Sequence, residues 1–438
     1  MAQHMHGKLR YLFRGTIGLM ALRITSVGLG MTVSAILART LGAEEFGIFA
    51  FAISIATLLA LPLTGGLPML LLREIAAARA EAHLERALGV IRWGYMTLFA
   101  VTAALVFFCV LVYAVAQSLE LWGWDDRQTA IALIVMAIVP VMGFLHVQRG
   151  ILGGHERPVL GALGEQLFRP LAMVALLLVT APFFHFESLG ALGLQLVATV
   201  VAALATMVAM QKVRVRSELS PEIQWREWAL ALMPLTALTA TGVIANNSDI
   251  LMLGILQPPE EVGVYRIAAQ VAMLAAILMQ ILRTLSAPRI AADHATGDIE
   301  AMRLHLVYSG RFMSAGALVF VVLFIFFGRY LLTLTFGSDY AAAFGPCLVL
   351  SLGTLFSASC GLVGVALQVT RHAGLVARAA VVAAIINVIL NLVLIPTYGT
   401  IGAAIGTSIA LVGMQGQLWW AARRVLGLRT DIFQRIGT

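Results

Sequence analysis

Arginine side chains inside apolar segments are the first residues of this chain whose type and position could do chemistry. Arg23 and Arg311 lie within long hydrophobic segments, and Arg266 lies at the start of another. A charge at the centre of a bilayer costs roughly 2.5–3.5 kcal/mol on insertion scales, so such residues are normally paired or functional. A guanidinium stays charged at low dielectric and binds an anion with two parallel hydrogen bonds. Anion binding is one interpretation of these residues, and snorkelling of the side chain to the membrane surface is the other.

A polar run around Asp249 is the second such feature. Asp249 is the one acid deep in a strongly apolar segment, and it directly follows Asn246, Asn247 and Ser248. Consecutive polar residues in hydrocarbon are costly unless they face a cavity or another helix. Asp249 is therefore a candidate site for a coupling ion, either a proton or Na⁺. Pairing with an arginine and a hydrogen-bond network between helices are the alternatives.

The elements that must position these residues are membrane-spanning helices. The 438 residues are 60% hydrophobic and 12% charged, with a mean hydropathy of +0.93, whereas a soluble chain carries roughly 25% charged residues. An apolar helix of ~20 residues crosses the hydrocarbon core with its backbone groups paired internally. We expect an all-α polytopic membrane protein with twelve spans, at 16–38, 46–70, 94–116, 130–148, 159–181, 189–210, 229–256, 264–287, 307–327, 343–367, 374–396 and 400–421.

Two of these spans contain residues that are unusual in a membrane helix. Pro62 and Gly65 interrupt the second, because proline removes a helical hydrogen bond and kinks the chain. The fifth carries Glu165 and Arg169, which share one helix face at a separation of four residues and could pair with each other.

The distribution of positive charge predicts the orientation. The net charge is +7, and all basic residues except Lys8 and Lys212 are arginines. They form short clusters between spans without a basic stripe, which argues against a nucleic-acid partner. Twenty-two basic residues fall in loops or near span ends on one side of the predicted bilayer and four on the other. By the positive-inside rule both termini are cytoplasmic, and no cleavable signal peptide is expected.

Catalytic and cofactor signatures are missing from the sequence. The two lysines are followed by Leu9 and Val213, so no Walker A motif exists. No His-Glu-x-x-His or Gly-x-Ser-x-Gly occurs, and the loops are too short for a catalytic domain. The three cysteines lie in apolar segments and fit neither a disulfide framework nor a zinc site. We expect no enzyme, no metal and no cofactor.

A faint internal repeat divides the chain into two halves. The segment Glu44–Phe49 aligns with Glu260–Tyr265 at an offset of 216 residues, and Arg73 aligns with Arg289 at the same offset. Each half holds six spans, so both enter the membrane from one side as a parallel repeat. The predicted lobes are residues 1–216 and 217–438, with the polar segment 212–227 at the boundary.

Three motifs resemble those of bacterial polysaccharide, or O-antigen, flippases. They are Leu41–Phe49, Asp249–Gly254 followed by Glu260–Tyr265, and Asn387 and Asn391 followed by residues 394–404. The resemblance covers nearly the whole chain and places it in the superfamily of multidrug, oligosaccharidyl-lipid and polysaccharide exporters. It implies two six-helix lobes in a V shape around a central cavity, with the first helix of each half lining the cleft.

The resemblance also implies a substrate and a location. The substrate would be undecaprenyl pyrophosphate carrying an oligosaccharide, a repeat unit for lipopolysaccharide, moved from the cytoplasmic to the outer leaflet of the bacterial inner membrane. A pyrophosphate needs a shielded cationic path, so Arg23, Arg311 and Arg266 are candidate phosphate ligands. Asn246 and Asn247 are candidate ligands of the sugar, and Asp249 could also accept from its hydroxyls. A glycan polymerase and glycosyltransferases are candidate partners.

Other classes of function remain as alternatives. A cation-coupled multidrug exporter of the same superfamily is the first, although organic cations would favour acids in the cavity and here arginine predominates within the spans. A membrane-bound glycan polymerase or ligase is the second, but it would need a large outer loop with catalytic residues. A scaffold without transport is the third.

Reporter fusions test the predicted orientation. Fusions after residues 42, 122, 258 and 398 should report an outer location, and fusions after 80, 218, 295 and 430 an inner one, since the basic loops stay in the cytoplasm. Reversal of any two adjacent reporters would contradict the twelve-span prediction.

Overall fold

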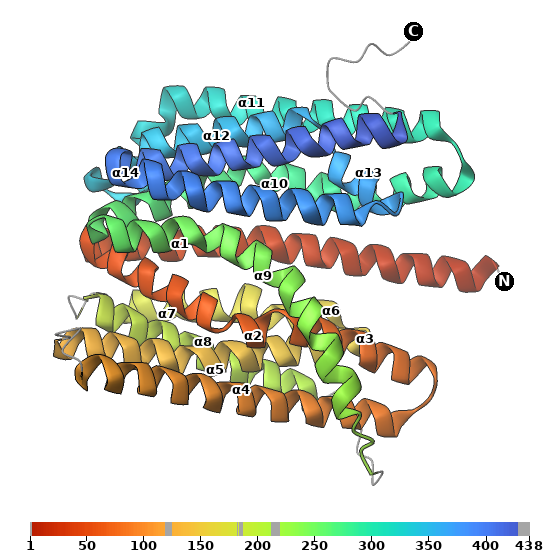
Figure 1. Ribbon diagram of the computed structural model, residues 1–438, viewed down its shortest axis with the longest axis horizontal. Helices are drawn as coiled ribbons and strands as arrows, with labels where there is room; N and C mark the ends of the chain where they lie inside the picture. Colours follow the sequence, from red (N-terminus) through yellow and green to blue (C-terminus); the bar gives the residue numbers. More distant parts are fainter. Residues whose placement is uncertain (1, 119–124, 182, 184–186, 212–219, 428–438) are drawn as a thin grey trace. The chain divides into compact units, whose positions relative to one another are not determined.

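A computed structural model describes residues 2–118, 125–181, 183, 187–211 and 220–427 (Figure 1). These residues form helices joined by short turns, and no strand occurs among them. The predicted lobe boundary and the fusion positions 122, 218 and 430 lie outside the described residues.

The chain forms two compact units. The first unit comprises Met1–Leu41 and Ala52–Val243, and the second comprises Gly42–Phe51 and Ile244–Thr438. The division therefore falls inside a helix, between Val243 and Ile244, and a short segment of the N-terminal half belongs to the second unit. The lobes 1–216 and 217–438 stay a prediction about the duplicated sequence.

The helices before the middle of the chain include four that are each long enough to span a bilayer and shorter helices that follow one another directly. In chain order the helices are α1 (Ala2–Leu59), α2 (Leu61–Thr64), α3 (Gly66–Ala80), α4 (Leu84–Ser118), α5 (Asp126–Gly154), α6 (Pro158–Leu163), the π-helical turn η1 (Gly164–Phe168), α7 (Arg169–Thr180) and α8 (Ser188–Gln211). The four long ones are α1, α4, α5 and α8.

The helices of the remaining chain follow the same pattern. They are α9 (Trp225–Leu256), α10 (Pro259–Thr296), α11 (Ile299–Phe336), the 3₁₀ helix η2 (Ser338–Ala343), α12 (Phe344–Ser359), α13 (Val363–Val369) and α14 (Ala373–Leu426).

Eleven helical segments of the described residues are long and apolar enough to cross a membrane. Two of them contain a break, because α1 is kinked at Gly42 and α14 at Gly399, where φ is 76° and 54°. Only glycine adopts such angles readily. The second predicted span continues from α1 through α2 into α3, with the expected interruption between Ala60 and Gly65. When α1 is divided at Gly42 and α14 at Gly399, each of the twelve predicted spans lies almost wholly in helix.

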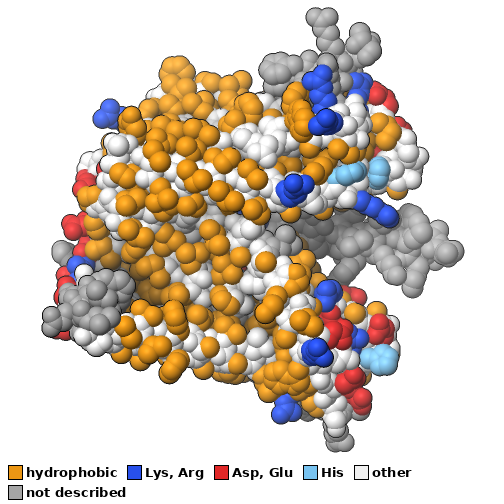
Figure 2. All heavy atoms as spheres, viewed as in Figure 1, with side chains coloured by type: hydrophobic (Ala, Val, Ile, Leu, Met, Phe, Trp, Pro, Cys, Tyr) orange, Lys and Arg blue, Asp and Glu red, His pale blue; other side chains and the backbone are white. Residues whose placement is uncertain are grey.

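The two units expose their apolar side chains on the outside. Phe99, Phe107 and Phe108 on α4 and Phe326 on α11 are largely exposed. On the face shown in Figure 2, hydrophobic side chains cover the middle of each unit and charged side chains gather at the ends of the helices. This distribution fits helices whose outer faces contact lipid and whose ends reach the headgroups.

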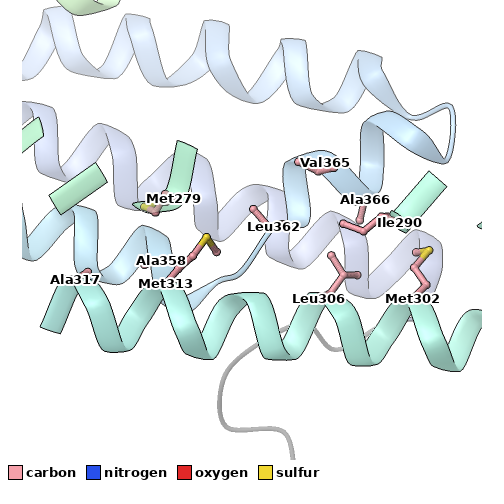
Figure 3. Close-up of a cluster of buried hydrophobic side chains, with 10 residues drawn as sticks. All are labelled: Met279, Ile290, Met302, Leu306, Met313, Ala317, Ala358, Leu362, Val365 and Ala366. Atoms are coloured by element: carbon pink, nitrogen blue, oxygen red, sulfur yellow. The ribbon is translucent and has the colours of Figure 1, made fainter. Parts of the chain in front are cut away.

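Apolar side chains of very different size fill the interior, from alanine to Trp228. In the first unit α5 packs between α3 and α8, and in the second α12 packs between α11 and α14. Figure 3 shows one core cluster of the second unit, in which methionines and alanines of α10 to α13 meet: Met279, Ile290, Met302, Leu306, Met313, Ala317, Ala358, Leu362, Val365 and Ala366. Alanine lets helix backbones approach closely, and methionine fills the irregular gaps left between them.

The internal repeat has a structural counterpart within the second unit. A Cβ atom on Gly47 would lie 1.7 Å from the carbonyl oxygen of Pro259, and one on Gly263 would lie 2.3 Å from that of Ala43. Gly47 and Gly263 are separated by 216 residues, and so are Ala43 and Pro259. The contacts are therefore reciprocal, as at a two-fold interface, and they support duplication of the half-chain.

Alanine substitution at Gly47 tests this close crossing. Gly47→Ala should destabilise the purified protein by about 1–3 kcal/mol, because the new methyl group overlaps the backbone of Pro259. Thermal unfolding in detergent measures the effect. Gly28→Ala is the matched control in α1, since a Cβ there meets nothing within 4 Å. Equal melting temperatures for the two variants would contradict the crossing.

Candidate functional site

The carboxylate of Asp249 lies at the centre of a buried polar network in the second unit. Its Oδ2 accepts hydrogen bonds from the Tyr265 hydroxyl at 2.7 Å and the Thr407 hydroxyl at 2.6 Å. Its Oδ1 accepts from the Asn391 amide at 2.7 Å. The donors come from α10 and from both halves of α14, so three helical segments meet the carboxylate carried by α9.

Two further side chains hold these donors in place. The Asn387 amide donates to the Thr407 hydroxyl at 3.0 Å, which leaves the hydrogen of Thr407 for Asp249. The Ser248 hydroxyl donates to Asn387 Oδ1 at 3.0 Å. Asn387 and Asn391 are one helical turn apart and therefore lie on one face of α14. Each hydrogen bond in the network has a consistent donor and acceptor when Asp249 is ionised.

Helix breaks place these residues at one depth. Asp249 lies seven residues before the end of α9 at Leu256, and Tyr265 lies six residues after the start of α10 at Pro259. Asn391 and Thr407 each lie eight residues from the kink at Gly399. At 1.5 Å per residue, all four lie ~10 Å from the same end of the helices. The two hairpins therefore bring polar side chains from distant sequence positions to one level.

Glycines permit the close approach of the two halves of α14. A Cβ on Gly402 would lie 2.3 Å from the Leu394 carbonyl oxygen, and one on Gly406 would lie 2.4 Å from Asn391 Oδ1. Gly399 makes the turn with its left-handed φ, and the Thr400 amide donates to Glu261 Oε2 at 3.2 Å. The Gly402-x-x-x-Gly406 spacing thus has the packing role that membrane helices give it.

The network compensates a buried carboxylate without a cation. None of the ion pairs among the described residues involves Asp249, so neutral donors take the place of the arginine that is one predicted alternative. Asn391 Oδ1 is buried with no hydrogen-bond partner among the described residues. Carboxylate, amide and hydroxyl oxygens are the ligands that hard cations prefer, and a carboxylate also accepts a proton. These oxygen atoms are of the kind that a small cation or a proton needs, and the coupling role of Asp249 stays a prediction.

The predicted arginine ligands are spread over both units. Arg23 on α1 and Arg311 on α11 are exposed. Arg266 follows Tyr265 of the network and is half-buried. It lies seven residues after the start of α10 at Pro259, and its place at the start of the membrane span stays a prediction. No ion pair of Arg23 or Arg266 occurs among the described residues.

The two asparagines before Asp249 differ from it in environment. Asn246 is exposed and Asn247 is half-buried, whereas Ser248 and Asp249 are buried. The four consecutive polar residues therefore point to different sides of the helix, and Ser248 and Asp249 take part in the network. Asn246 and Asn247 stay predicted ligands of a substrate.

Tyr265 and Thr407 belong to the site although the sequence did not single them out. Tyr265 occupies the repeat position of Phe49, so the second copy carries a hydroxyl where the first has none. That difference between the two copies could have indicated Tyr265 as a site residue. Nothing in the sequence indicated Thr407, because a threonine in an apolar helix commonly donates a hydrogen bond to the backbone of its own helix.

The fold is that of membrane transporters. It matches a multidrug resistance MATE family transporter of the MOP superfamily in its inward-facing conformation, with a TM-score of 0.74, 15% identity and coverage of 92% of this chain and 94% of the other. The lipid II flippase MurJ matches with a TM-score of 0.69 at 14% identity, over 94% and 87%. A MOP superfamily transporter from Pyrococcus furiosus matches with a TM-score of 0.63 at 14% identity, over 95% and 96%.

The chain belongs to the family of polysaccharide biosynthesis proteins, whose family model matches residues 12–292. A segment of 171 residues is 25% identical to the probable low-salt glycan biosynthesis flippase Agl15 of Haloferax volcanii, and covers 39% of this chain and 36% of that protein. These relatives are named as flippases or transporters and none as an enzyme. The family and fold inferred from the motifs are confirmed, and the chain is a multi-pass membrane protein.

Removal of single donors tests whether the Asp249 network binds a coupling ion. Asp249→Asn should abolish transport driven by an ion gradient and leave substrate binding intact. The amide of asparagine cannot take up a proton, and it has no negative charge to balance the charge of a bound cation. Tyr265→Phe and Thr407→Val should weaken the coupling, because each removes one donor to Oδ2. Reconstituted vesicles with an imposed proton or Na⁺ gradient provide the measurement.

The control for these variants is Tyr398→Phe, which changes an exposed tyrosine beside the Gly399 kink. It should leave coupling unchanged. If Asp249→Asn lowers only the amount of folded protein while transport per molecule stays normal, the network is structural and the coupling role is wrong.

Proposed function

We propose that this protein is a flippase for undecaprenyl-pyrophosphate-linked oligosaccharide. It moves a polysaccharide repeat unit, such as an O-antigen unit, from the cytoplasmic to the outer leaflet of the bacterial inner membrane by alternating access. The observation that carries the proposal is the match to the polysaccharide biosynthesis family over more than half of the chain. The named flippase Agl15 among its relatives supports the same class of activity.

Arginine chemistry supports an anionic substrate. The pyrophosphate must leave water on its path, and a guanidinium binds it bidentately while keeping its own charge. Arg23 and Arg311 are exposed side chains on apolar helices, and Arg266 is half-buried. The polyprenyl tail can remain in lipid throughout, so only the headgroup needs a polar path. Arg23, Arg311 and Arg266 are the proposed phosphate ligands, and Asn246 and Asn247 the proposed ligands of the sugar.

Asp249 supplies the proposed site for energy coupling. Its neutral donors can reorient when a proton or Na⁺ binds, and the orphan Asn391 Oδ1 adds one more oxygen ligand. Binding energy at this site would favour one conformation of the second unit over another, which is the requirement for coupling. The termini lie in the cytoplasm in this proposal.

Reconstitution with labelled polyprenyl-pyrophosphate oligosaccharide tests the function directly. The wild-type protein should expose the labelled headgroup to an outside reagent, whereas empty vesicles should not. A quaternary ammonium dye tested in the same vesicles distinguishes the proposed flippase from a multidrug exporter. Transport of the dye without transport of the glycolipid would contradict the proposal.

Substitution of Arg23 tests the phosphate ligand. Arg23→Gln should reduce flipping about tenfold or more, since loss of a charge-assisted hydrogen bond costs roughly 1.5–3 kcal/mol. Arg23→Lys should be intermediate, because lysine keeps the charge but not the bidentate geometry. Arg92→Gln is the control, as Arg92 is an exposed arginine in the third turn of α4. Wild-type flipping by Arg23→Gln at equal protein level would defeat the assignment.

A further inference from the structure

The end of α14 carries two arginines that are held in place without losing their charge. Arg423 and Arg424 lie in the last turn of α14 and are exposed. The guanidinium carbon of Arg424 lies 4.8 Å from the ring centre of Trp420, and that of Arg423 lies 5.7 Å from the ring centre of Trp419. An aromatic face attracts a cation but does not neutralise it. Among the described residues neither arginine makes a hydrogen bond or an ion pair, so the donors of both guanidiniums stay available for an anion.

The other arm of α14 brings two further arginines to the same end. Arg371 lies in the turn before α14 and Arg378 in its second turn, and both are exposed. The two arms lie side by side (Figure 1), and their ends share one apolar cluster that includes Leu375, Val376, Ala379, Leu418, Trp419 and Ala422. Arg371, Arg378, Arg423 and Arg424 therefore belong to one surface at the joined ends of the arms, here called the α14 arginine surface.

The α14 arginine surface lies at the depth of lipid headgroups. Arg378 precedes the kink at Gly399 by 21 residues, and Arg424 follows it by 25. At 1.5 Å per residue the arms reach ~32 Å and ~38 Å from the kink, and the hydrocarbon core of a bilayer is ~30 Å thick. With the kink at one face of the membrane, the arginines lie among the headgroups of the other face. Trp420 is exposed, and tryptophan is enriched at this depth.

An exposed apolar stripe continues from Arg378 along one face of α14. Val381, Val382 and Ile385 follow Arg378 at three, four and seven positions, a spacing that places them on the same side of a helix. All three are exposed. A positive charge followed by apolar side chains along the helix matches the two parts of an anionic phospholipid, its headgroup and its acyl chain.

No acidic side chain among the described residues pairs with the α14 arginine surface. Between Asp339 and Asp431 the sequence contains no aspartate or glutamate. Acids do occur at the adjoining ends of α10 and α11, which pack beside α13. Each of them has a partner of its own: Asp293 contacts His305 at 2.6 Å, Asp298 accepts from the Ala301 amide at 2.9 Å, and Glu300 accepts from Arg303 at 2.9 Å.

The first unit shows that membrane orientation does not require such an uncompensated surface. Its arginines near helix ends are paired with acids, because Arg73 and Arg86 contact Glu74, and Arg149 contacts Glu165. The positive-inside rule counts lysine and arginine and depends little on acids. Orientation therefore explains the arginines in both units, but it does not explain why those of α14 lack acidic partners.

A repeated turn carries opposite charges in the two units. Glu156 and Arg371 are 215 residues apart and both have a left-handed φ, 61° and 65°. In each turn the next amide donates to the carbonyl oxygen five residues before it, at 2.9 Å in the first unit and 2.8 Å in the second. Glycine adopts this conformation most readily, so the turn itself demands neither charge. The positive charge of Arg371 is therefore not a consequence of the backbone geometry.

We propose that the α14 arginine surface binds the headgroup phosphate of an anionic phospholipid of the surrounding bilayer. A guanidinium binds a phosphate with two parallel hydrogen bonds, and four of them around one headgroup favour an anionic lipid over a zwitterionic one. The acyl chain lies along the apolar stripe that begins at Val381. The identity of a transported substrate does not enter the argument.

Native mass spectrometry of the full-length protein tests this surface with two lipids of different charge. Phosphatidylglycerol and phosphatidylcholine are added separately to the purified protein in detergent, and the bound lipids are counted at each concentration. The wild-type protein should bind phosphatidylglycerol about tenfold or more tightly, since several arginines attract the same headgroup. Arg423→Gln/Arg424→Gln should lose most of that preference.

The matched control removes two exposed arginines from the first unit. Arg92→Gln/Arg157→Gln lowers the net charge by the same amount and should keep the preference for phosphatidylglycerol. If Arg423→Gln/Arg424→Gln does not fold, Arg371→Gln/Arg378→Gln removes the same charge from the other arm and should have the same effect.

Four outcomes would overturn the proposal. They are equal binding of the two lipids by the wild-type protein, an unchanged preference in the folded variant of the surface, an equal loss of preference in the control, and displacement of phosphatidylglycerol by the same concentration of inorganic phosphate. The last result would indicate a site for free anions. No readout involves transport, so a failure here is distinct from a failure of the proposed flippase activity.

Discussion

The lack of hydrogen-bond partners in hydrocarbon is the constraint on which the rest of this structure depends. Each backbone amide and carbonyl must find its partner within the chain, which explains why the described residues form long helices and short turns. The same constraint acts on side chains. Asp249 is tolerated in a membrane-spanning helix because three hydroxyl and amide groups donate to it. A polar residue in this chain is therefore informative, since its cost must be offset by a specific set of neighbours.

Close backbone approach makes those neighbours available. The network needs α14 to fold back on itself at Gly399, and it needs the two arms to touch at Gly402 and Gly406. Gly47 and Gly263 allow an equally close crossing at the repeat-related positions. Glycine thus serves two purposes here, as a turn residue and as a contact surface. Substitution at either kind of position would separate the donors from the carboxylate or the helices from each other.

Two carboxylates of the membrane-embedded units, the buried Asp249 and the half-buried Glu165, are compensated in different ways. Asp249 is surrounded by neutral donors, whereas Glu165 contacts a guanidinium and an imidazole. Neutral donors can reorient around a bound cation, whereas the guanidinium of Arg149 keeps its charge beside Glu165. The cost of a carboxylate in a membrane helix is thus offset by neutral donors in one unit and by a fixed positive charge in the other.

The sequence by itself determined the class of this protein and most of its helices. Long apolar runs leave no alternative to membrane helices, and the motifs identified the family that the comparison later matched. Asp249, Asn387 and Asn391 were recognisable because polar residues stand out against an apolar background. Only the tertiary structure decided that Tyr265 and Thr407 complete the network, and that Glu165 meets Arg149 and His146 in addition to the charge of Arg169. The physical reason is that sequence periodicity places a residue on a face of its own helix, whereas its partner depends on how other helices, with their kinks at glycine, pack against that face.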